Sequence, residues 1–541
     1  MCINGSADQF FSAQNSRFVD ITDLNRKGSY TVRNENSFNY ESLTTANLNI
    51  TRGRHQLFSN LGYNFASSET NYYSMVTEGF PFDRLDNLLF AAQYQANGRP
   101  SGDESTIRRV GLVYNGGYTY DNRFLANVSV RKDGSSQYGT QKKFGVFWSA
   151  GLGWNIHNEK FFRQGDLVNR LKLRASYGAT GSLNIPAYSA QSRYSFGTST
   201  SYFGDLGATL VGLGNSLLSW QNVLKSNIGL DLVMFRERLD VRLDAYRENT
   251  RNSLTEITLA PSTGFLSYSE NLGQIQNTGF EFSARYKILE NSNKGLLWSV
   301  NVNGITNKNI LKELSNKLKA SNEKLNNGND KQVVPNILLQ EGQAINTIYV
   351  VPSLGVDPAT GAEVFLTKDG QKTFVWNAAD KVPYGITQPK WNGNFGSNFM
   401  YKGFEVNLIF SYQFGGQLYN QTLVDKVESV NPAFNVDRRA YDLGWAAPGD
   451  VSRYTRITTN SYQNPTRLTS RFVQDDNTLS LGSASFGYNF YRNAFVKRLG
   501  MRSLQVTAIT NDLFRVSSIE IERGTSNPFA RTYSLSLRAG F

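Results

Sequence analysis

The side chains that commonly catalyse reactions or bind metals are sparse in this sequence. It has two histidines, His55 and His157, and one cysteine, Cys2. Catalysis and metal binding need such groups beside carboxylates at defined spacing, and neither histidine has that setting. No phosphate-binding glycine loop or calcium-loop signature occurs, and turn chemistry explains the oxygen-rich stretches at 326–330 and 474–477. We therefore expect no enzymatic activity and no metal or cofactor site.

Aromatic side chains in long polar stretches are better candidates for binding. Tyr and Trp rings pair a flat apolar face with a polar edge, which suits sugar rings and peptide side chains. Taken singly, each is more often explained by loop packing or by a membrane-interface position. The candidate substrate-binding residues are Tyr72, Tyr73, Tyr202, Tyr441 and Trp445, with Phe80, Phe82 and Phe203 beside the first three.

Charged residues on regularly alternating segments form a second candidate set, which consists of Asp240, Arg242, Asp244 and Glu405. They could line a solute path, or they could pair across neighbouring strands and fill a wall. The net charge is +12, with Lys and Arg spread along strands and turns rather than clustered. We interpret them as lumen, rim and turn charges that face anionic lipid headgroups, and we do not expect nucleic-acid binding.

The elements that position these residues alternate strictly between apolar and polar positions. In residues 239–248 one side is apolar while the other carries charges, and 171–177, 404–413 and 532–541 repeat this pattern. Such alternation over about ten residues is typical of a tilted strand that crosses a bilayer. About sixteen segments qualify: 29–38, 44–52, 54–66, 105–120, 123–132, 146–156, 168–178, 222–235, 238–249, 275–288, 295–308, 392–401, 403–414, 477–490, 501–511 and 531–541.

The composition, and the alternation of short with long connections, indicate an all-β transmembrane antiparallel barrel. No run of about 18 apolar residues occurs, whereas aromatics reach 13%. Tight connections alternate with long ones, as in outer-membrane barrels with short periplasmic turns and long extracellular loops. A soluble β-sandwich is the alternative that composition alone leaves open. The expected long loops lie near 67–104, 179–221, 250–274, 309–391, 415–476 and 512–530.

Two local features are expected within the longest loop. Ile310, Leu311, Leu314 and Leu318 have helical spacing, which predicts a short helix over 309–325. Further on, the Gly- and Asp-containing stretch 355–361 predicts a turn between two short strands.

Several motifs, taken in order, resemble the C-terminal part of the starch-utilisation-type (SusC/RagA-like) TonB-dependent transporters of Bacteroidota. Each motif is weak alone, and Trp148 replaces a proline that is usual in the family. The resemblance covers nearly the whole chain. Its motifs are Arg131–Ser136, Phe147–Trp154, Leu171–Gly181, Asn271–Gly273, Asn277–Glu281, Trp445 with Pro448–Asp450, Arg471–Asp475, Gly487–Asn489 and Asn511–Phe514.

The resemblance implies a twenty-two-stranded barrel, of which residues 1–541 would supply the C-terminal portion. The family's signal peptide, TonB box and plug domain do not occur in this chain, and residues 1–5 lack a signal-peptide pattern. We therefore expect a barrel fragment that runs out at a closing strand, Tyr533–Phe541. In the family such a terminal aromatic signals to the membrane-insertion machinery.

The function implied by the resemblance is active uptake of a large nutrient across the cell outer membrane. An oligosaccharide is the expected substrate and a peptide is the alternative. The implied partners are a SusD-like surface lipoprotein, TonB acting through N-terminal parts, and outer-membrane lipid with lipopolysaccharide. A complete sixteen-stranded diffusion porin and a surface adhesion receptor are the rival hypotheses from other classes.

Overall fold

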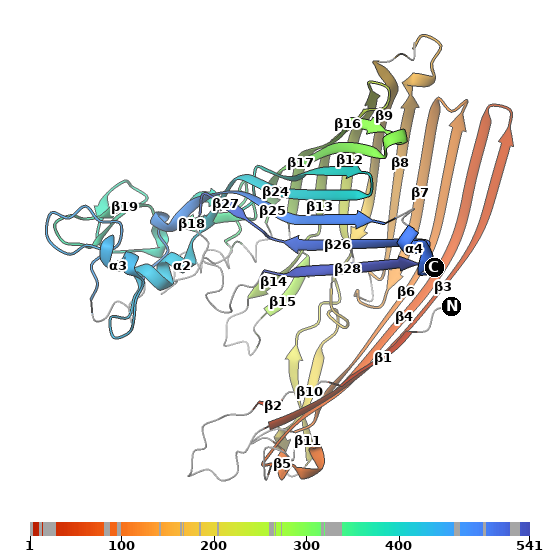
Figure 1. Ribbon diagram of the computed structural model, residues 1–541. Coiled ribbons are helices and arrows are strands. Elements are labelled where there is room, and N and C mark those ends of the chain that lie inside the picture. Colours follow the sequence, from red (N-terminus) through yellow and green to blue (C-terminus); the bar gives the residue numbers. More distant parts are fainter. Residues whose placement is uncertain are drawn as a thin grey trace.

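The structure is a computed structural model, and it folds into one curved antiparallel sheet with loop structures at its ends (Figure 1). It describes residues 4–9, 13–14, 29–80, 87–94, 99–139, 142–162, 165, 167–182, 185–202, 205–258, 265, 267–271, 273–314, 319, 338–458, 466–490, 494–519 and 531–541. The main sheet contains 19 strands, in which neighbours along the chain pair with each other.

The long strands follow each other around the sheet in chain order. β28 pairs with β26 at one edge, and β3 pairs with the short β1 (Asn4–Gln9) at the other. These long strands are β3 (Ser29–Arg52), β4 (His55–Glu78), β6 (Ser101–Tyr120), β7 (Phe124–Ser135), β8 (Phe144–Asn155), β9 (Val168–Ser182), β12 (Gln221–Met234), β13 (Leu239–Arg251), β16 (Gln274–Asn291), β17 (Leu296–Glu313), β23 (Trp391–Tyr401), β24 (Phe404–Tyr419), β25 (Val473–Asn489), β26 (Ser503–Asn511) and β28 (Tyr533–Gly540).

The smaller elements lie at the sheet ends and in the connections. The main sheet also contains three short strands, β2 (Ala13–Gln14), β5 (Gln93–Tyr94) and β27 (Arg515–Ser517). Hairpins outside it are β10 (Arg193–Tyr202) with β11 (Asp205–Gly212), and β14 (Leu254–Thr258) with β15 (Ser267–Asn271). The described part includes the α-helices α2 (Gln421–Leu423), α3 (Arg438–Asp442) and α4 (Ala494–Arg498). No helix in it is long and apolar enough to span a membrane.

The predicted all-β antiparallel fold is confirmed, with one correction to the strand count. The segments 29–38 and 44–52 are a single strand, β3, which pairs with β4 without a break from Ser29 to Arg52. Residues 39–43, which separate the two expected segments, are held extended by the continuous backbone ladder with β4. β3 and β4 each have 24 residues, more than the roughly ten that cross a bilayer, so both extend well beyond it.

The connections separate into two kinds, at opposite ends of the strands (Figure 1). The turn rim is the set of short connections at 53–54, 121–123, 156–167, 235–238, 292–295, 402–403 and 490–502. Several of these turns use left-handed backbone, as at Asp121 and Asn122 with φ of 51° and 52°, because such turns match the twist of paired strands. The loop rim, at the other end, carries the long connections and the small hairpins.

The prediction of a helix over 309–325 is wrong for its first residues. Residues 309–313 continue β17, where Ile310 and Leu311 pair with β16. Leu311 and Leu314 are buried against partly buried Leu339 and Ile345, so their apolar spacing serves packing rather than a helix face. Leu318 and residues 320–325 lie outside the described residues, as do 326–330.

The turn expected at 355–361 is confirmed. It joins β19 (Ser353–Val356) to β20 (Glu363–Leu366), which continues to β21 (Lys372–Thr373). The Asp357 carboxylate accepts from the backbone N–H and hydroxyl of Thr360, at 3.1 and 2.6 Å. The Asp357 carbonyl also accepts from the Gly361 N–H at 2.8 Å.

The main buried clusters lie under the loop rim rather than inside the sheet. The largest joins the connection before β23 to the one after β24, and includes fully buried Val350, Val424 and Val427. A second centres on Tyr138 and Trp220, whose rings stack at 4.5 Å. The sheet itself has no second layer behind it, so each strand presents one apolar and one polar face.

The two faces predict different tolerance to charge. Ile228 lies in the middle of β12 on the apolar face and is 67% exposed, whereas Ser176 on the adjacent β9 lies on the polar face opposite Asn227. We expect Ile228→Arg to destabilise the barrel by about 2–4 kcal/mol, because lipid does not solvate the charge. Ser176→Arg is the matched control and should cost far less. Guanidinium unfolding in liposomes measures both, and equal losses would contradict the face assignment.

Candidate functional site

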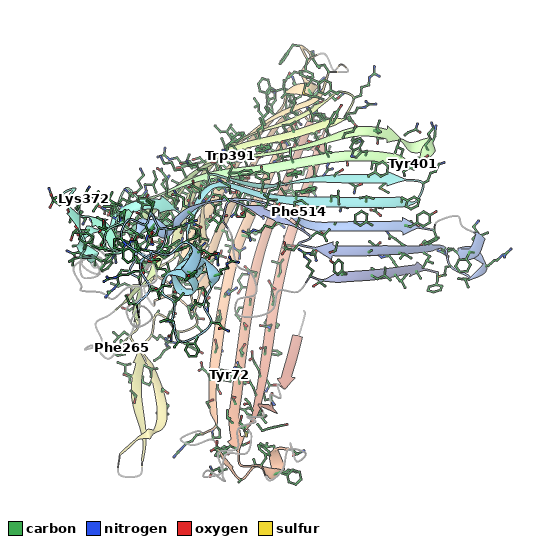
Figure 2. All side chains as sticks on the ribbon, turned by 60° about the vertical axis from the view of Figure 1, so that its left-hand side comes forward. Tyr72, Phe265, Lys372, Trp391, Tyr401 and Phe514 are labelled. Carbon is green, nitrogen blue, oxygen red and sulfur yellow. The ribbon has the colours of Figure 1, made fainter. Side chains whose placement is uncertain are left out.

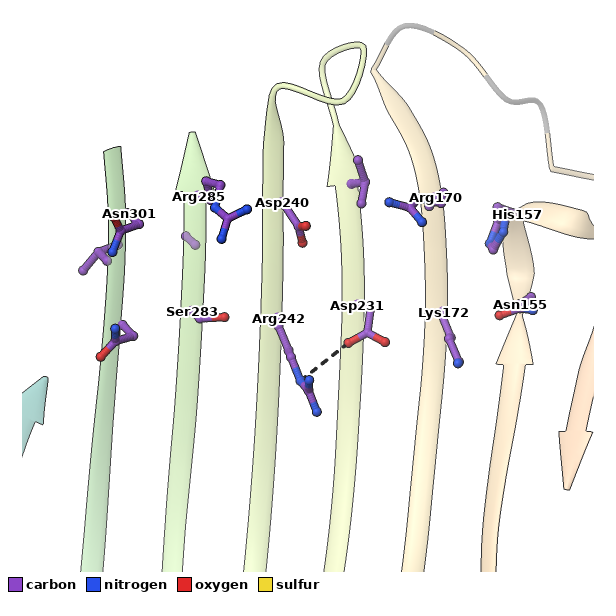
Figure 3. A pocket seen from close by; sticks show the side chains of 14 residues that line it. Asn155, His157, Arg170, Lys172, Asp231, Asp240, Arg242, Ser283, Arg285 and Asn301 are labelled. Carbon is purple, nitrogen blue, oxygen red and sulfur yellow. Dashed lines mark ion pairs between the residues drawn. The ribbon is translucent and has the colours of Figure 1, made fainter. Parts of the chain in front are cut away.

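The polar face of β8 to β17 carries charged residues in cross-strand rows. The strand register aligns one row nearest the turn rim, made of Arg170, Val233, Asp240, Arg285 and Asn301. The next row consists of Asn155, Lys172, Asp231, Arg242, Ser283 and Asn303. Figure 3 shows both rows, with their side chains on the same side of the sheet.

These two rows line an open cavity of about 820 Å³. Within the described residues, Arg170, Lys172 and Arg285 form no ion pair, and neither does Asp240. The wall therefore presents unpaired charges of both signs to the lumen, with cations in excess. Such a surface can hold polar or anionic groups by hydrogen bonds and charge.

A neighbouring charge cluster is paired internally. The guanidinium of Arg174 donates to both carboxylate oxygens of Asp231 at 2.9 Å and to Asp244 at 3.1 Å. Arg242 donates to Asp244 at 3.0 Å, and Asn227 donates to the same carboxylate at 3.0 Å. Since Asp244 is only 9% exposed, its three donors compensate the cost of its burial. This cluster fixes the wall over three adjacent strands, β9, β12 and β13.

The polar face of β3 to β7 carries paired charges, such as Arg131 with Asp133, and a row of uncharged amide and hydroxyl groups. Asn60 donates to Asn47 at 2.5 Å, Asn115 donates to Asn60 at 3.4 Å, and the Ser129 hydroxyl donates to Asn115 at 2.8 Å. These four residues, the amide ladder, cross four adjacent strands at one level. Amide and hydroxyl groups pair with sugar hydroxyls or peptide groups without requiring a charge.

Two long connections on the loop rim fold into one unit, which we call the loop module (residues 346–390 and 420–458 with 466–472). β18 (Thr347–Val350) pairs with β22 (Val382–Ile386) inside the first connection. Backbone hydrogen bonds join Val351 to Leu468 at 3.2 Å and Ser470 to Val351 at 3.0 Å. The indole N–H of Trp376 donates to the Leu468 carbonyl at 3.0 Å. Figure 1 places this module beyond the ends of β24 and β25.

A buried ion cluster connects the two halves of the loop module. The Arg471 guanidinium donates to Glu363 at 2.9 Å and to Glu428 at 2.5 Å, and the Glu428 side chain has no exposed surface. Thr469 and Thr455 donate to the same two carboxylates, at 2.6 and 2.8 Å. Burial alone would lower the pKa of Arg471, but the two carboxylates outweigh it and raise that pKa above its usual value. Arg471 therefore stays charged and joins two loops that are distant in sequence.

Comparison with known proteins decides the family. The TonB dependent receptor-like β-barrel family model matches residues 4–443. The chain belongs to this family. It is 26% identical to TonB-dependent receptor P39 of Formosa agariphila over 91% of this chain and 50% of that protein. It is 25% identical to TonB-dependent receptor SusC of Bacteroides thetaiotaomicron over 78% of this chain and 43% of that protein.

Solved structures agree on the fold. The RagAB peptide transporter superposes with a TM-score of 0.79 at 21% identity, covering 91% of this chain and 53% of that one. The RagAB peptide importer in its open-open state gives a TM-score of 0.78 over 95% of this chain. The chain spans about half the length of the relatives that it matches. TonB-dependent receptor barrels are multi-strand proteins of the outer membrane, which confirms the expected location and the SusC/RagA resemblance.

The structure separates Tyr72 from Tyr73. Both were expected in a loop, but they are adjacent residues of β4, so their side chains point to opposite faces. Tyr72 lies opposite Glu35 under the Arg33 guanidinium, 4.2 Å from its ring centre. The Tyr73 hydroxyl accepts from Asn34 at 2.9 Å. These two rings cannot contact one ligand together, and Tyr72 shares the face of the amide ladder.

The other aromatic candidates have different settings. Tyr441 lies in α3 and is 82% exposed, so its ring is available to a ligand. Trp445 donates its indole N–H to the Pro358 carbonyl at 2.9 Å, and its ring covers Gly361, so it also serves packing. Phe80 is buried beside Tyr30. Tyr202 ends β10, whereas Phe82 and Phe203 lie outside the described residues.

The charged candidates have two different settings. Arg242 and Asp244 pair within the wall, whereas Asp240 stays open to the cavity without an ion pair among the described residues. Glu405 on β24 accepts from Gln505 on β26, at 3.1 Å, across the intervening strand. The most connected residues, Arg174 and Arg471, were not singled out. Arg174 lies on the polar side of the alternating segment 171–177, and that alternation could have identified it. No local pattern identifies Arg471, because its partners come from distant loops.

The histidines lie near the turn rim. The Nδ1 atom of His55 is 2.7 Å from the Tyr118 hydroxyl, and the Nδ1 atom of His157 is 3.0 Å from the Leu171 carbonyl oxygen. No cluster of three metal-binding side chains occurs within the described ranges.

Removal of Arg471 tests the role of the buried ion cluster. Arg471→Met leaves two buried carboxylates without their cation, and we expect the loop module to lose about 3–5 kcal/mol of local stability. Trypsin digestion should then cut within 420–458 about a hundredfold to several thousandfold faster, because each 1.4 kcal/mol corresponds to a factor of about ten.

Arg438→Met is the matched control, because Arg438 is 88% exposed and its pair with Asp442 contributes less than about 1 kcal/mol. The double variant Arg471→Met/Glu428→Gln should recover part of the lost protection. Unchanged digestion of Arg471→Met would show that the ion cluster does not hold the two loops together.

Proposed function

We propose that this protein forms the wall and loop surface of a TonB-dependent transporter that imports an oligosaccharide. The main support for this proposal is the amide ladder, which presents uncharged donors and acceptors along the lumen face of four strands. A neutral polar wall replaces the water that a sugar chain loses on entering, without trapping it by charge. The SusC-like family membership supports the transport role.

The partners follow from the same proposal. A SusD-like surface lipoprotein would dock on the loop module and pass substrate to the lumen, and TonB would supply the energy. The loop module supports docking because it is a packed unit with its own core rather than a set of separate loops. It also exposes large apolar side chains such as Phe434 and Tyr441, at 74% and 82%. Exposed apolar groups of this kind are typical of protein interaction surfaces.

Peptide uptake is the second candidate, and the charged rows favour it. Asp240 and the unpaired cations Arg170, Lys172 and Arg285 offer both signs of charge. Peptides carry both signs at their termini and on side chains, whereas neutral oligosaccharides carry none. The likeness to the RagAB peptide transporter supports the fold but, at 21% identity, not the substrate.

Uptake by intact cells separates these possibilities from a passive porin. A deletion strain should lose growth on the oligosaccharide substrate but keep growth on its monosaccharide. A protonophore or loss of TonB should abolish uptake, because the transport is active. Uptake that survives both treatments would identify a diffusion porin, and loss of growth on peptides alone would identify a peptide importer.

Tyr441 tests the contribution of the loop aromatics. Removal of one stacking ring, Tyr441→Ala, should weaken oligosaccharide binding to purified transporter about fivefold, as for an aromatic contact of about 1 kcal/mol. Tyr73→Ala is the control, because Tyr73 lies on the face opposite to the amide ladder. Titration calorimetry measures both variants. Equal affinities for Tyr441→Ala and the parent would remove Tyr441 from the binding surface.

A further inference from the structure

The positive charge of the chain is concentrated on the turn rim. Its seven connections contain ten described Lys or Arg residues but three Asp or Glu residues. By contrast, residues 351–390 of the loop module contain four of each sign. Basic residues were expected in the turns, and each turn contributes between one and three of them. The three-dimensional structure gathers these isolated cations at one end of the barrel (Figure 1).

Aromatic rings accompany these cations where the strands end. The Arg123 guanidinium lies 5.6 Å from the ring centres of Tyr120 and Phe124, and the Lys402 ammonium lies 5.3 Å from that of Tyr401. Phe124 and Phe404 are 45% and 58% exposed on the outside of the sheet. Aromatic rings at the level of lipid headgroups with cations just beyond them mark a membrane interface. Figure 2 shows Tyr401 at such a strand end.

Helix α4 adds an amphipathic segment to this rim. Val496 is buried, whereas Phe495 and Leu499 are 59% and 53% exposed. Because these two residues are four positions apart, they lie on the same side of the helical turn. Lys497 and Arg498 between them are exposed and form no ion pair within the described residues. A short helix with two exposed apolar groups and two free cations matches the boundary between acyl chains and phosphates.

The attachment of α4 places it at the edge of the apolar band. The Arg502 N–H donates to the Gly540 carbonyl at 2.6 Å, just after the helix, and Ser503 pairs with the same residue at the end of β28. The exposed Leu535 and Leu537 of β28 belong to the lipid-facing side. Figure 1 shows α4 beside the ends of β26 and β28. The surface of the helix thus continues an apolar face that lipid covers.

We propose that the turn rim binds anionic phospholipids of the adjoining leaflet, with α4 as the main contact. Phe495 and Leu499 lie among acyl chains, while Lys497, Arg498 and neighbouring turn cations bind lipid phosphates. Charge complementarity supports this occupant, because the rim has few acidic groups to neutralise its cations and two of them, Asp121 and Glu159, already pair with Arg123. This proposal does not depend on the transported substrate.

Native mass spectrometry of the purified protein, titrated with phosphatidylglycerol or phosphatidylcholine, tests the headgroup preference. We expect tighter binding of phosphatidylglycerol, which Lys497→Gln/Arg498→Gln should weaken by about 25-fold, because each cation contributes about fivefold. Lys368→Gln/Lys372→Gln removes the same charge from the loop module and should leave binding unchanged. Equal binding of both lipids, or equal losses in both double variants, would overturn the proposal.

Spin labels test the depth of α4 independently. Labels at Phe495→Cys and Leu499→Cys, in a Cys2→Ser background, are measured in vesicles of phosphatidylglycerol and phosphatidylethanolamine. We expect collisions with dissolved oxygen to exceed those with a water-soluble nickel complex. A label at Lys368→Cys serves as the aqueous control. Equal water exposure at all three positions would exclude membrane contact by α4.

Discussion

Every backbone N–H and C=O group in the lipid-embedded part must find a partner within the protein, and the rest of this structure depends on that constraint. The hydrocarbon region offers no water, so an unpaired peptide group costs several kcal/mol there. The long antiparallel ladders satisfy it for the strands inside the sheet, as in the unbroken pairing of β4 with β3 and β6. Because strands alternate their side chains, the same ladder separates a lipid face from a lumen face.

The functional surfaces are consequences of that separation. Once the lipid face is fixed, the opposite side chains line an interior where polar groups are solvated. The lumen face divides into an amide-rich part on β3 to β7 and a charged part on β8 to β17. Where strands leave the bilayer, the chain can form ordinary protein cores, and the loop module uses one. Its buried Arg471, Glu363 and Glu428 connect segments that the sheet alone would leave independent.

Local sequence pattern predicted the sheet well because the strand period is strong and repeats. It predicted the charged face of β13, since Asp240, Arg242 and Asp244 alternate with apolar residues. It failed where tertiary pairing overrides local signals, as in the polar middle of β3 and at Ile310 and Leu311 in β17. The Arg471 cluster could not be predicted, because residues 363, 428 and 471 meet only after two loops pack together. The gathering of turn cations at one rim was missed for a similar reason, since each turn contributes only one to three of them.

The central claim is that the charged and amide-rich faces line a water-filled lumen while the opposite faces contact lipid. Single cysteines along β12 at positions 225 to 232, in a Cys2→Ser background, test it most directly with a membrane-impermeant maleimide. The account predicts strong labelling at Lys225, Asn227 and Asp231, and little at Ile228, Leu230 and Leu232. Labelling without a two-residue period, or with the opposite phase, would contradict it.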